Sequence, residues 1–220
     1  LRQEKSANRV RWEVEYPRRH NNGGATLVLN VPRASELLLN TVSADQDISG
    51  IDVRRLQADT VSGSLTAAGR SGDSKLNTVS GNVIAKLQTP RLDVNTVSGR
   101  IEAGGGVSGD IGAQTVSGRV GVDAGRVRLA VETVSGGIDL STSGLAPGGR
   151  INVESVSASV NLRLPVKVSA QLSVNSFAGS INSDAGTVER PRYGPGSSLD
   201  TKLGGGDGDI RIQSHSGSVR

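Results

Sequence analysis

The chain has 220 residues, a formal net charge of +4, and a composition rich in glycine and poor in aromatic residues. Its 30 glycines stand against one tryptophan, two tyrosines and one phenylalanine, which is poor material for a compact two-layer globule built around large side chains. Charges of both signs are interspersed, which excludes a dedicated phosphate-binding surface and a disordered polyampholyte. The absence of cysteine excludes disulfides, thiolate metal sites and a cysteine nucleophile.

Membrane and export signals are also missing from the sequence. No run of about eighteen apolar residues occurs, so we expect no membrane span, and no charged-then-apolar signal segment opens the chain. Because the chain begins at Leu1 rather than methionine, we expect that an upstream segment was cleaved or is left out of this sequence, and an export segment is absent from it.

Residues 1–30 are predicted to form strands that cap the N-terminal end of the domain. Arg9–Tyr16 (RVRWEVEY) alternates apolar and polar side chains, as a strand does, and Pro17 ends it. We expect Trp12 to cover the open end of the core, because a stack of strands exposes unpaired edges at its ends. The alternative for Trp12 is an aromatic platform that stacks on a ligand.

Residues 31–220 are organised by a repeated tetrad, Thr-Val-Ser-Gly in its clearest copies. The tetrads begin at Thr41, Thr60, Thr78, Thr96, Thr115, Thr133, Ser155, Ser176 and Ser214. Most are spaced by 18 to 22 residues, and the last interval is 38, about twice that spacing. This interval predicts one disguised or missing copy between Ser176 and Ser214, near an irregular insertion at about 186–200.

Counting from the first residue of each tetrad as position zero, the repeats align in columns. Positions −4 and +5 are each aliphatic in eight of nine copies, and apolar residues also recur at −2 and +7. Period-two apolar residues on either side of a Ser-Gly corner predict two short strands in each unit. Position −1 is an amide or a carboxylate in every copy and is expected to face outward, and position +3 is mostly glycine, as a tight corner requires.

A two-strand unit cannot bury its apolar face alone, so the units are expected to stack in register. The fold class predicted is all-β, a single-stranded β-solenoid of about ten rungs of 18–19 residues, as a single domain with caps at both ends. The Thr or Ser at position zero and the Ser at +2 are expected to form hydroxyl ladders along the stack. At position −5 Arg and Asp alternate over five units, which favours pairing between neighbouring rungs until Arg150 breaks the pattern.

Arg100 and Arg119 break the charge balance, because both occupy position +4 on adjacent rungs. They are the candidate contacts for an anion or a partner, and the alternative is a pair of solvated side chains. No other residue is a candidate for a catalytic, cofactor-binding or metal-binding role.

The chain resembles the DUF4097 family, bacterial proteins of the toastrack group of β-solenoids that are often labelled adhesins. Besides the tetrads, the resemblance rests on Ala25–Ala44 (ATLVLNVPRASELLLNTVSA), Leu164–Ile181 (LPVKVSAQLSVNSFAGSI) and Leu203–Val219 (LGGGDGDIRIQSHSGSV). It covers about Ala25–Arg220 and implies a right-handed coil, an exported or envelope-associated protein and no catalytic residue. Departures from the pattern are Ala44 and Ala158 at the glycine position and a small insertion in the first rung.

Three chemical sites were weighed against structural explanations. The sequence GGGDGD at 204–209 is similar to a calcium-binding nonapeptide, but its aspartate is out of place and a capping turn fits better. The two histidines, His20 and His215, are expected to lie far apart, so no serine has a positioned base. A carbohydrate-active enzyme could use clustered carboxylates, but the candidates fall in different columns: Asp93, Glu102, Asp110, Asp123 and Asp139.

We therefore expect a non-enzymatic structural or interaction module that is periplasmic, on the cell surface or secreted. Its expected partner is an envelope protein, a glycan or a second copy of the chain, with a link to envelope-stress sensing as a variant. No cofactor is expected, and no nucleic acid, because aromatic platforms are missing. The alternative is a carbohydrate-active β-helix enzyme or a polysaccharide-binding protein.

Overall fold

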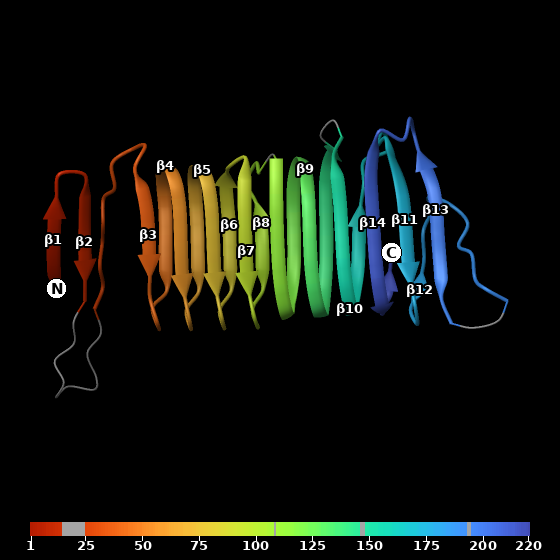
Figure 1. Cartoon of the computed structure of the whole chain (residues 1–220), viewed down its shortest axis with the longest axis horizontal. Helices are drawn as coiled ribbons and strands as arrows, with labels where there is room; N and C mark the ends of the chain where they lie inside the picture. The colour runs from red at the N-terminus through yellow and green to blue at the C-terminus, as the bar shows by residue number, and fades with distance from the viewer. Residues whose placement is uncertain (15–24, 108, 146–147, 193–194) are drawn as a thin grey trace. The chain divides into compact units, whose positions relative to one another are not determined.

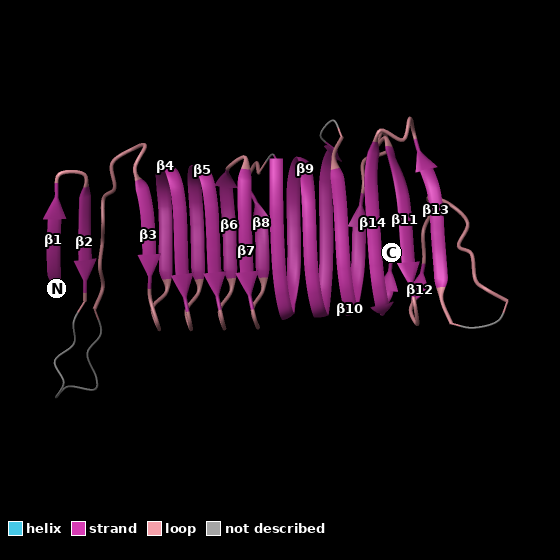
Figure 2. Cartoon of the chain, in the orientation of Figure 1, coloured by secondary structure: helices cyan, strands magenta, loops and turns pink. Residues whose placement is uncertain are grey.

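The computed structural model describes residues 1–14, 25–107, 109–145, 148–192 and 195–220. These residues form strands and no helix (Figures 1 and 2). The strands are β1 (Arg2–Ser6), β2 (Arg9–Glu13), β3 (Glu36–Asn40), β4 (Gln46–Thr60), β5 (Leu65–Thr78), β6 (Val83–Gln88), β7 (Arg91–Thr96), β8 (Ile101–Gly104), β9 (Gly109–Leu145), β10 (Arg150–Arg163), β11 (Ala170–Ser176), β12 (Ser180–Ile181), β13 (Ser197–Leu203), β14 (Gly208–Ser216) and β15 (Ser218–Val219). The chain divides into two compact units, Leu1–Val31 and Pro32–Arg220.

The first unit contains an antiparallel hairpin of β1 and β2. Its register pairs Arg2 with Glu13 and Gln3 with Trp12. The predicted strand at Arg9–Tyr16 is present as β2, Arg9–Glu13. The last two residues of the predicted strand lie outside the described residues, and so do Pro17 and His20. Trp12 is 39% exposed. The capping role of residues 1–30 stays a prediction.

The second unit is the predicted β-solenoid, with the repeat columns stacked in parallel register. Leu37, Leu56, Ser74 and Leu92 are successive partners in the −4 column. The +5 column aligns in the same way, with Leu65 opposite Val83 and Val83 opposite Ile101. The irregular first rung is also present as predicted, because a bulge shifts the register between Ile48 and Ile51. About seven turns follow one another in sequence order.

The core consists of small aliphatic side chains from the inward columns. Leu56, Leu76, Leu92, Val120 and Ile138 have no exposed surface. Their burial explains how a chain with so few aromatic residues stabilises a fold: each turn contributes a few aliphatic side chains, and stacking joins them into one continuous cluster.

The glycines at position +3 permit the turns to approach closely at the corner. A Cβ added to Gly99 would lie 1.8 Å from the carbonyl oxygen of Gly81, and one added to Gly81 would lie 1.9 Å from that of Gly63. Real Cβ atoms essentially never approach another atom within 3.0 Å. The glycine column is therefore required by the spacing of the turns, and only some of its members also have a positive φ, as Gly136 does at 133°.

The last strands of the solenoid are stacked out of sequence order. Strand β14, near the C-terminus, lies between β10 and β11 and pairs in parallel with both. Strand β13 pairs antiparallel with β11, so Ser197 lies opposite Ser176 (Figure 1). The long final interval in the repeat therefore does not hide another parallel rung among the described residues. The rung count is correspondingly below the ten predicted.

Charged residues at position −5 pair between turns. Arg55 lies 3.5 Å from Asp73, and Arg128 lies 2.7 Å from Asp110. Arg150 interrupts this alternation, as expected, because the parallel register of Ile151 with Leu129 places it beside Arg128. Because β14 is inserted beside β10, Arg150 lies 3.5 Å from Asp209.

Candidate functional site

The two arginines singled out from the sequence lie on the exposed surface of neighbouring turns. Arg100 Nη1 is 3.3 Å from Glu102 Oε1, and Arg119 Nε is 3.9 Å from Asp139 Oδ2. Each guanidinium therefore has a carboxylate beside it, which offsets part of the positive charge of the pair. A role for Arg100 and Arg119 in binding an anion or partner stays a prediction.

The GGGDGD segment forms the turn between β13 and β14. Gly204 and Gly206 have positive φ values of 55° and 80°, and the Asp207 carboxylate accepts a hydrogen bond of 2.8 Å from Ser169 Oγ. Asp209 faces Arg150 and Arg211 at 3.5 and 3.4 Å. Within the described ranges, no group of three or more His, Asp or Glu residues is placed to hold a metal ion.

The carboxylates considered for glycoside chemistry are mostly paired with arginines of their own or a neighbouring turn. Asp93 faces Arg91, and Asp110 faces Arg128. Asp93 raises the pKa of Arg91, first by a hydrogen bond and then by its charge, with Asp73 adding to the effect. These contacts are exposed ion pairs within one turn or between neighbouring turns, and they give no support for a pair of carboxylates facing one scissile bond.

A different feature of the surface is a row of valines at position +1, which we call the valine stripe. It consists of Val61, Val79, Val97, Val116, Val134 and Val156, each 46–49% exposed. The alternation of the strand explains this exposure: the threonine at position zero points inward, so the residues on either side of it point outward. Six apolar side chains are thus aligned along one edge of the solenoid, a turn apart.

The outward residues at position −1 form a second row parallel to the stripe, which we call the amide ladder. The members beside the valine stripe are Asn77, Asn95, Gln114, Glu132, Glu154, Gln213 and Asn175. Neighbouring turns are joined by their side chains, because Asn95 Nδ2 donates to Asn77 Oδ1 at 2.9 Å and Gln114 Nε2 donates to Glu132 Oε2 at 3.1 Å. The bonds hold the ladder in one conformation and leave part of its hydrogen-bonding capacity free.

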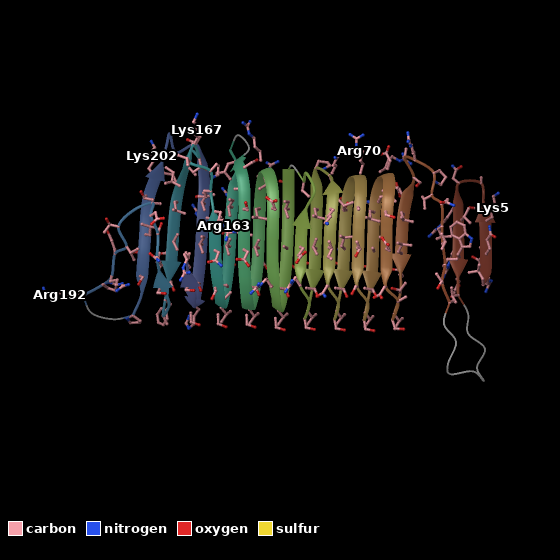
Figure 3. The ribbon with its side chains drawn as sticks, turned by 180° about the vertical axis from the view of Figure 1, so that it is seen from behind. Lys5, Arg70, Arg163, Lys167, Arg192 and Lys202 are labelled. Carbon is pink, nitrogen blue, oxygen red and sulfur yellow. The ribbon has the colours of Figure 1, made fainter. Side chains whose placement is uncertain are left out.

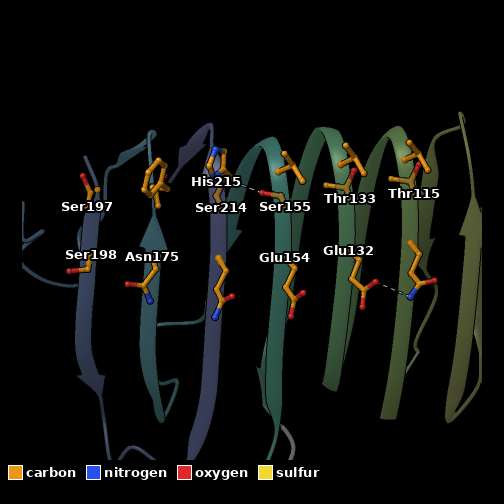
Figure 4. A pocket seen from close by; sticks show the side chains of 18 of the residues that line it. Thr115, Glu132, Thr133, Glu154, Ser155, Asn175, Ser197, Ser198, Ser214 and His215 are labelled. Carbon is orange, nitrogen blue, oxygen red and sulfur yellow. Dashed lines mark hydrogen bonds between the residues drawn. The ribbon is translucent and has the colours of Figure 1, made fainter. Parts of the chain in front are cut away.

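Four members of the valine stripe, Val97, Val116, Val134 and Val156, form one wall of a groove along the solenoid, and the amide ladder forms the other. The groove has a volume of about 1190 Å³ and runs over the turns from Asn77 to Asn175. Figure 4 shows the part of the groove from Thr115 to Ser197: Glu132 and Glu154 lie in one row, and Thr133 and Ser155 lie in the row beside the stripe. The floor is the backbone around position zero. Neither Arg100 nor Arg119 lines it.

One end of the groove has a different lining. Phe177 and His215, which stand at position +1 of the last two turns, stack with ring centroids 4.9 Å apart and an angle of 11° between the planes. Glu189, Arg190 and Pro191 also contribute to the lining, and the backbone of Glu189 pairs with that of Ser198. His215 stands where most turns have valine, and its ring packs on that of Phe177.

Hydroxyl groups fix the corner that carries the stripe. The serine at +2 donates to the carbonyl of the valine in the preceding turn, as Ser80 Oγ does to Val61 O at 3.4 Å and Ser157 Oγ does to Val134 O at 3.4 Å. The predicted ladders thus run largely through backbone carbonyls, and Ser155 to Ser214 is a direct hydroxyl pair at 3.1 Å. A corner held in this way presents the valines in a fixed register.

The groove is acidic although the chain as a whole is basic. Its described lining includes three carboxylates, Glu132, Glu154 and Glu189, and one arginine, Arg190. Glu132 and Glu154 are direct neighbours in the parallel register, and among the described residues their side chains accept hydrogen bonds from the amides of Gln114 and Asn152. An apolar wall beside a polar, acidic wall is suited to binding.

Basic side chains lie at the opposite edge of the solenoid. The strands β4, β5 and β7 end at the edge that carries the valine stripe. Arg70, Lys167 and Lys202 project from the other edge (Figure 3). The carboxylates of the groove lining outnumber its one arginine, so a cationic partner is favoured there.

The groove was not identified from the sequence, although a signal for it was present. Valine recurs at position +1 in seven of the nine copies, and this position follows an inward threonine. An apolar residue repeated at an outward position cannot be explained by core packing, which is the pattern expected of a binding surface.

A comparison with protein families matches residues 21–220 with the family described as Toastrack DUF4097. No curated protein and no solved structure matches the chain. Among the described residues, no helix has the length and apolar character needed to cross a membrane.

Proposed function

Because the chain belongs to the Toastrack DUF4097 family, we propose that it is a non-enzymatic interaction module of the bacterial envelope that binds its partner in the groove. The fold and the family fit a structural or interaction module. The envelope location, whether periplasmic, on the cell surface or secreted, and an adhesin-like activity are the finer parts of the proposal.

The observation that carries the proposal is the valine stripe. Six side chains at equivalent positions keep 46–49% of their surface exposed, whereas the inward aliphatic residues of the same turns are almost fully buried. Exposed single apolar residues are ordinary, but an aligned row beside a polar wall marks a surface that another molecule covers. A rigid corner also lowers the entropy cost of binding, because the valines are already ordered.

A photo-crosslinking experiment tests this proposal. A photoreactive amino acid is placed at Val116, in the middle of the stripe, or at Val166, which is fully exposed and lies away from the groove. Each full-length protein is then irradiated with an envelope fraction. The proposal predicts a discrete adduct from position 116 that is absent from position 166, and that disappears when Val97 and Val134 are changed to threonine.

Threonine is the suitable replacement because it keeps the shape and β-branching of valine and adds a hydroxyl group. The matched control is Val166→Thr, which should leave the adduct at position 116 intact. Identical adducts from positions 116 and 166, or an adduct unaffected by the threonine changes, would contradict the proposal.

A further inference from the structure

We propose that the groove binds a partner segment in the polyproline II conformation that carries basic side chains, a refinement that rests on the proposed function. The occupant is thus a peptide, rich in proline, with arginine or lysine at every third position. Three features of the groove point to this chemistry: the spacing of its turns, the polar groups of its ladder and the position of its carboxylates.

The first argument is geometrical. Stacked turns are about 4.8 Å apart, so two turns span about 9.6 Å. A polyproline II helix has three residues per turn and a rise of about 3.1 Å, so equivalent side chains recur every 9.3 Å or so. One side chain in three can therefore meet every second turn of the groove with little drift over its length.

Other extended or helical segments match this spacing less well. A β-strand places side chains on one side about every 6.8 Å, which falls between turns. An α-helix has a pitch of about 5.4 Å and drifts from the stacked turns by about 0.6 Å at each one. The groove covers seven ladder positions, about 29 Å, which corresponds to about nine residues of polyproline II.

The second argument concerns hydrogen bonding. A polyproline II segment makes no internal hydrogen bonds, so its carbonyl groups need donors from the partner. The amide ladder supplies such donors, because each Asn or Gln side chain carries two N–H groups and the bond along the ladder uses one of them. The opposite wall is apolar, and proline rings can pack between the methyl groups of Val97, Val116 and Val134.

The third argument is charge complementarity. Glu132 and Glu154 lie on adjacent turns, so one guanidinium or ammonium group can contact both carboxylates. The next basic side chain, three residues further on, lies about two turns away, where Asn175 offers a side-chain amide oxygen. Glu189 lies about four strand spacings from Glu154, because its backbone pairs with that of Ser198 beyond Asn175, so the basic side chain six residues further on is the one that reaches it.

The end of the groove is lined by residues of a similar composition. Arg190 and Pro191 of the chain itself belong to the same lining as the stacked pair of Phe177 and His215. Aromatic side chains are a common part of the surfaces that bind proline-rich peptides. The groove thus offers an aromatic pair to a partner segment that lies along the valine stripe.

Fluorescence anisotropy with synthetic peptides tests the inference on the full chain. The probe is a labelled peptide of about twelve residues with the repeat Pro-Pro-Arg. Two peptides serve as comparisons: Pro-Pro-Glu, which reverses the charge, and Gly-Ser-Arg, which keeps the charge and removes the polyproline II preference. We expect the Pro-Pro-Arg peptide to bind at least about tenfold more tightly than either.

Variants locate the binding site. The double variant Glu132→Gln/Glu154→Gln and the triple variant Val97→Thr/Val116→Thr/Val134→Thr should each weaken binding by about tenfold or more. The charge-matched control is Glu36→Gln/Asp184→Asn, which removes two exposed carboxylates outside the groove and should change affinity by less than about twofold.

Equal binding of the Pro-Pro-Arg and Gly-Ser-Arg peptides would overturn the inference, because charge alone would then suffice. Groove variants that bind the Pro-Pro-Arg peptide as tightly as the control variant does would also overturn it. A third contrary result is that no peptide binds, while an oligosaccharide binds the unchanged chain and not the groove variants. In each of these cases a groove-specific crosslink from position 116 would still support the proposed function, so the two failures are distinguishable.

Discussion

The replacement Gly99→Ala should destabilise the solenoid although it adds only one methyl group. The new Cβ would lie 1.8 Å from the carbonyl oxygen of Gly81. A close carbon-to-oxygen contact is about 3.3 Å, so the two turns must separate by about 1.5 Å or rotate at the corner. The backbone bonds from Ser98 N to Val79 O at 3.0 Å and from Ser117 N to Val97 O at 2.9 Å oppose that movement.

The expected cost is about 2–4 kcal/mol in the free energy of unfolding. Overpacking costs about 1–3 kcal/mol, and weakened corner hydrogen bonds add about 0.5–1.5 kcal/mol each. Urea denaturation followed by far-ultraviolet circular dichroism measures the change as a lower midpoint. Gly121→Ala is the matched control: the nearest atom to its new Cβ is Ile101 O at 3.7 Å, so we expect a change within about 0.5 kcal/mol. Equal stability of the Gly99 and Gly121 variants would refute the close-approach explanation.

Two further predictions concern the strand order and the surface charges. A chain that ends at Asp207 lacks β14 and β15, so β10 and β11 lose their shared partner, and we expect a lower thermal midpoint of unfolding. A peptide of residues 208–220 added in trans should raise that midpoint, whereas a scrambled peptide should not. The exposed ion pair of Arg128 with Asp110 should contribute little, so Arg128→Ala should change the free energy of unfolding by less than about 1 kcal/mol in urea, and a loss well above that value would mean that the pair is a major determinant of register.

The register of the turns was predictable from sequence, because the repeat is local. Leu56 and Leu92 occupy equivalent positions in their units, and a unit that cannot bury its apolar residues alone must stack them on those of its neighbours. The same reasoning gave the outward direction of the amide ladder.

The order of the last turns could not be predicted in the same way. The tetrads at Ser176 and Ser214 both fit the repeat, and nothing in their composition specifies which of them lies next to β10. That choice depends on the antiparallel pairing of β13 with β11, which returns the chain to the gap between β10 and β11. The salt bridge between Arg150 and Asp209 follows from this arrangement and not from sequence spacing.

The candidate site was only partly accessible from sequence. Alternation about an inward threonine places positions −1 and +1 on the same outward side, so both walls could have been assigned from the repeat. Their concavity, and the stacking of Phe177 on His215 at the end, depend on how the corner bends and on the position of β14. Arg100 and Arg119 drew attention as unbalanced charges, but their carboxylate neighbours are visible only in three dimensions.

The most direct test of the account is competition between a synthetic peptide and the natural partner for the groove. The protein with a photoreactive residue at position 116 is irradiated with envelope fraction in the presence of the Pro-Pro-Arg or the Pro-Pro-Glu peptide. The account predicts that the adduct is lost with increasing Pro-Pro-Arg peptide and unchanged with Pro-Pro-Glu. An adduct that persists when the Pro-Pro-Arg peptide is bound at saturation would contradict the claim that the valine stripe and the amide ladder form one binding groove.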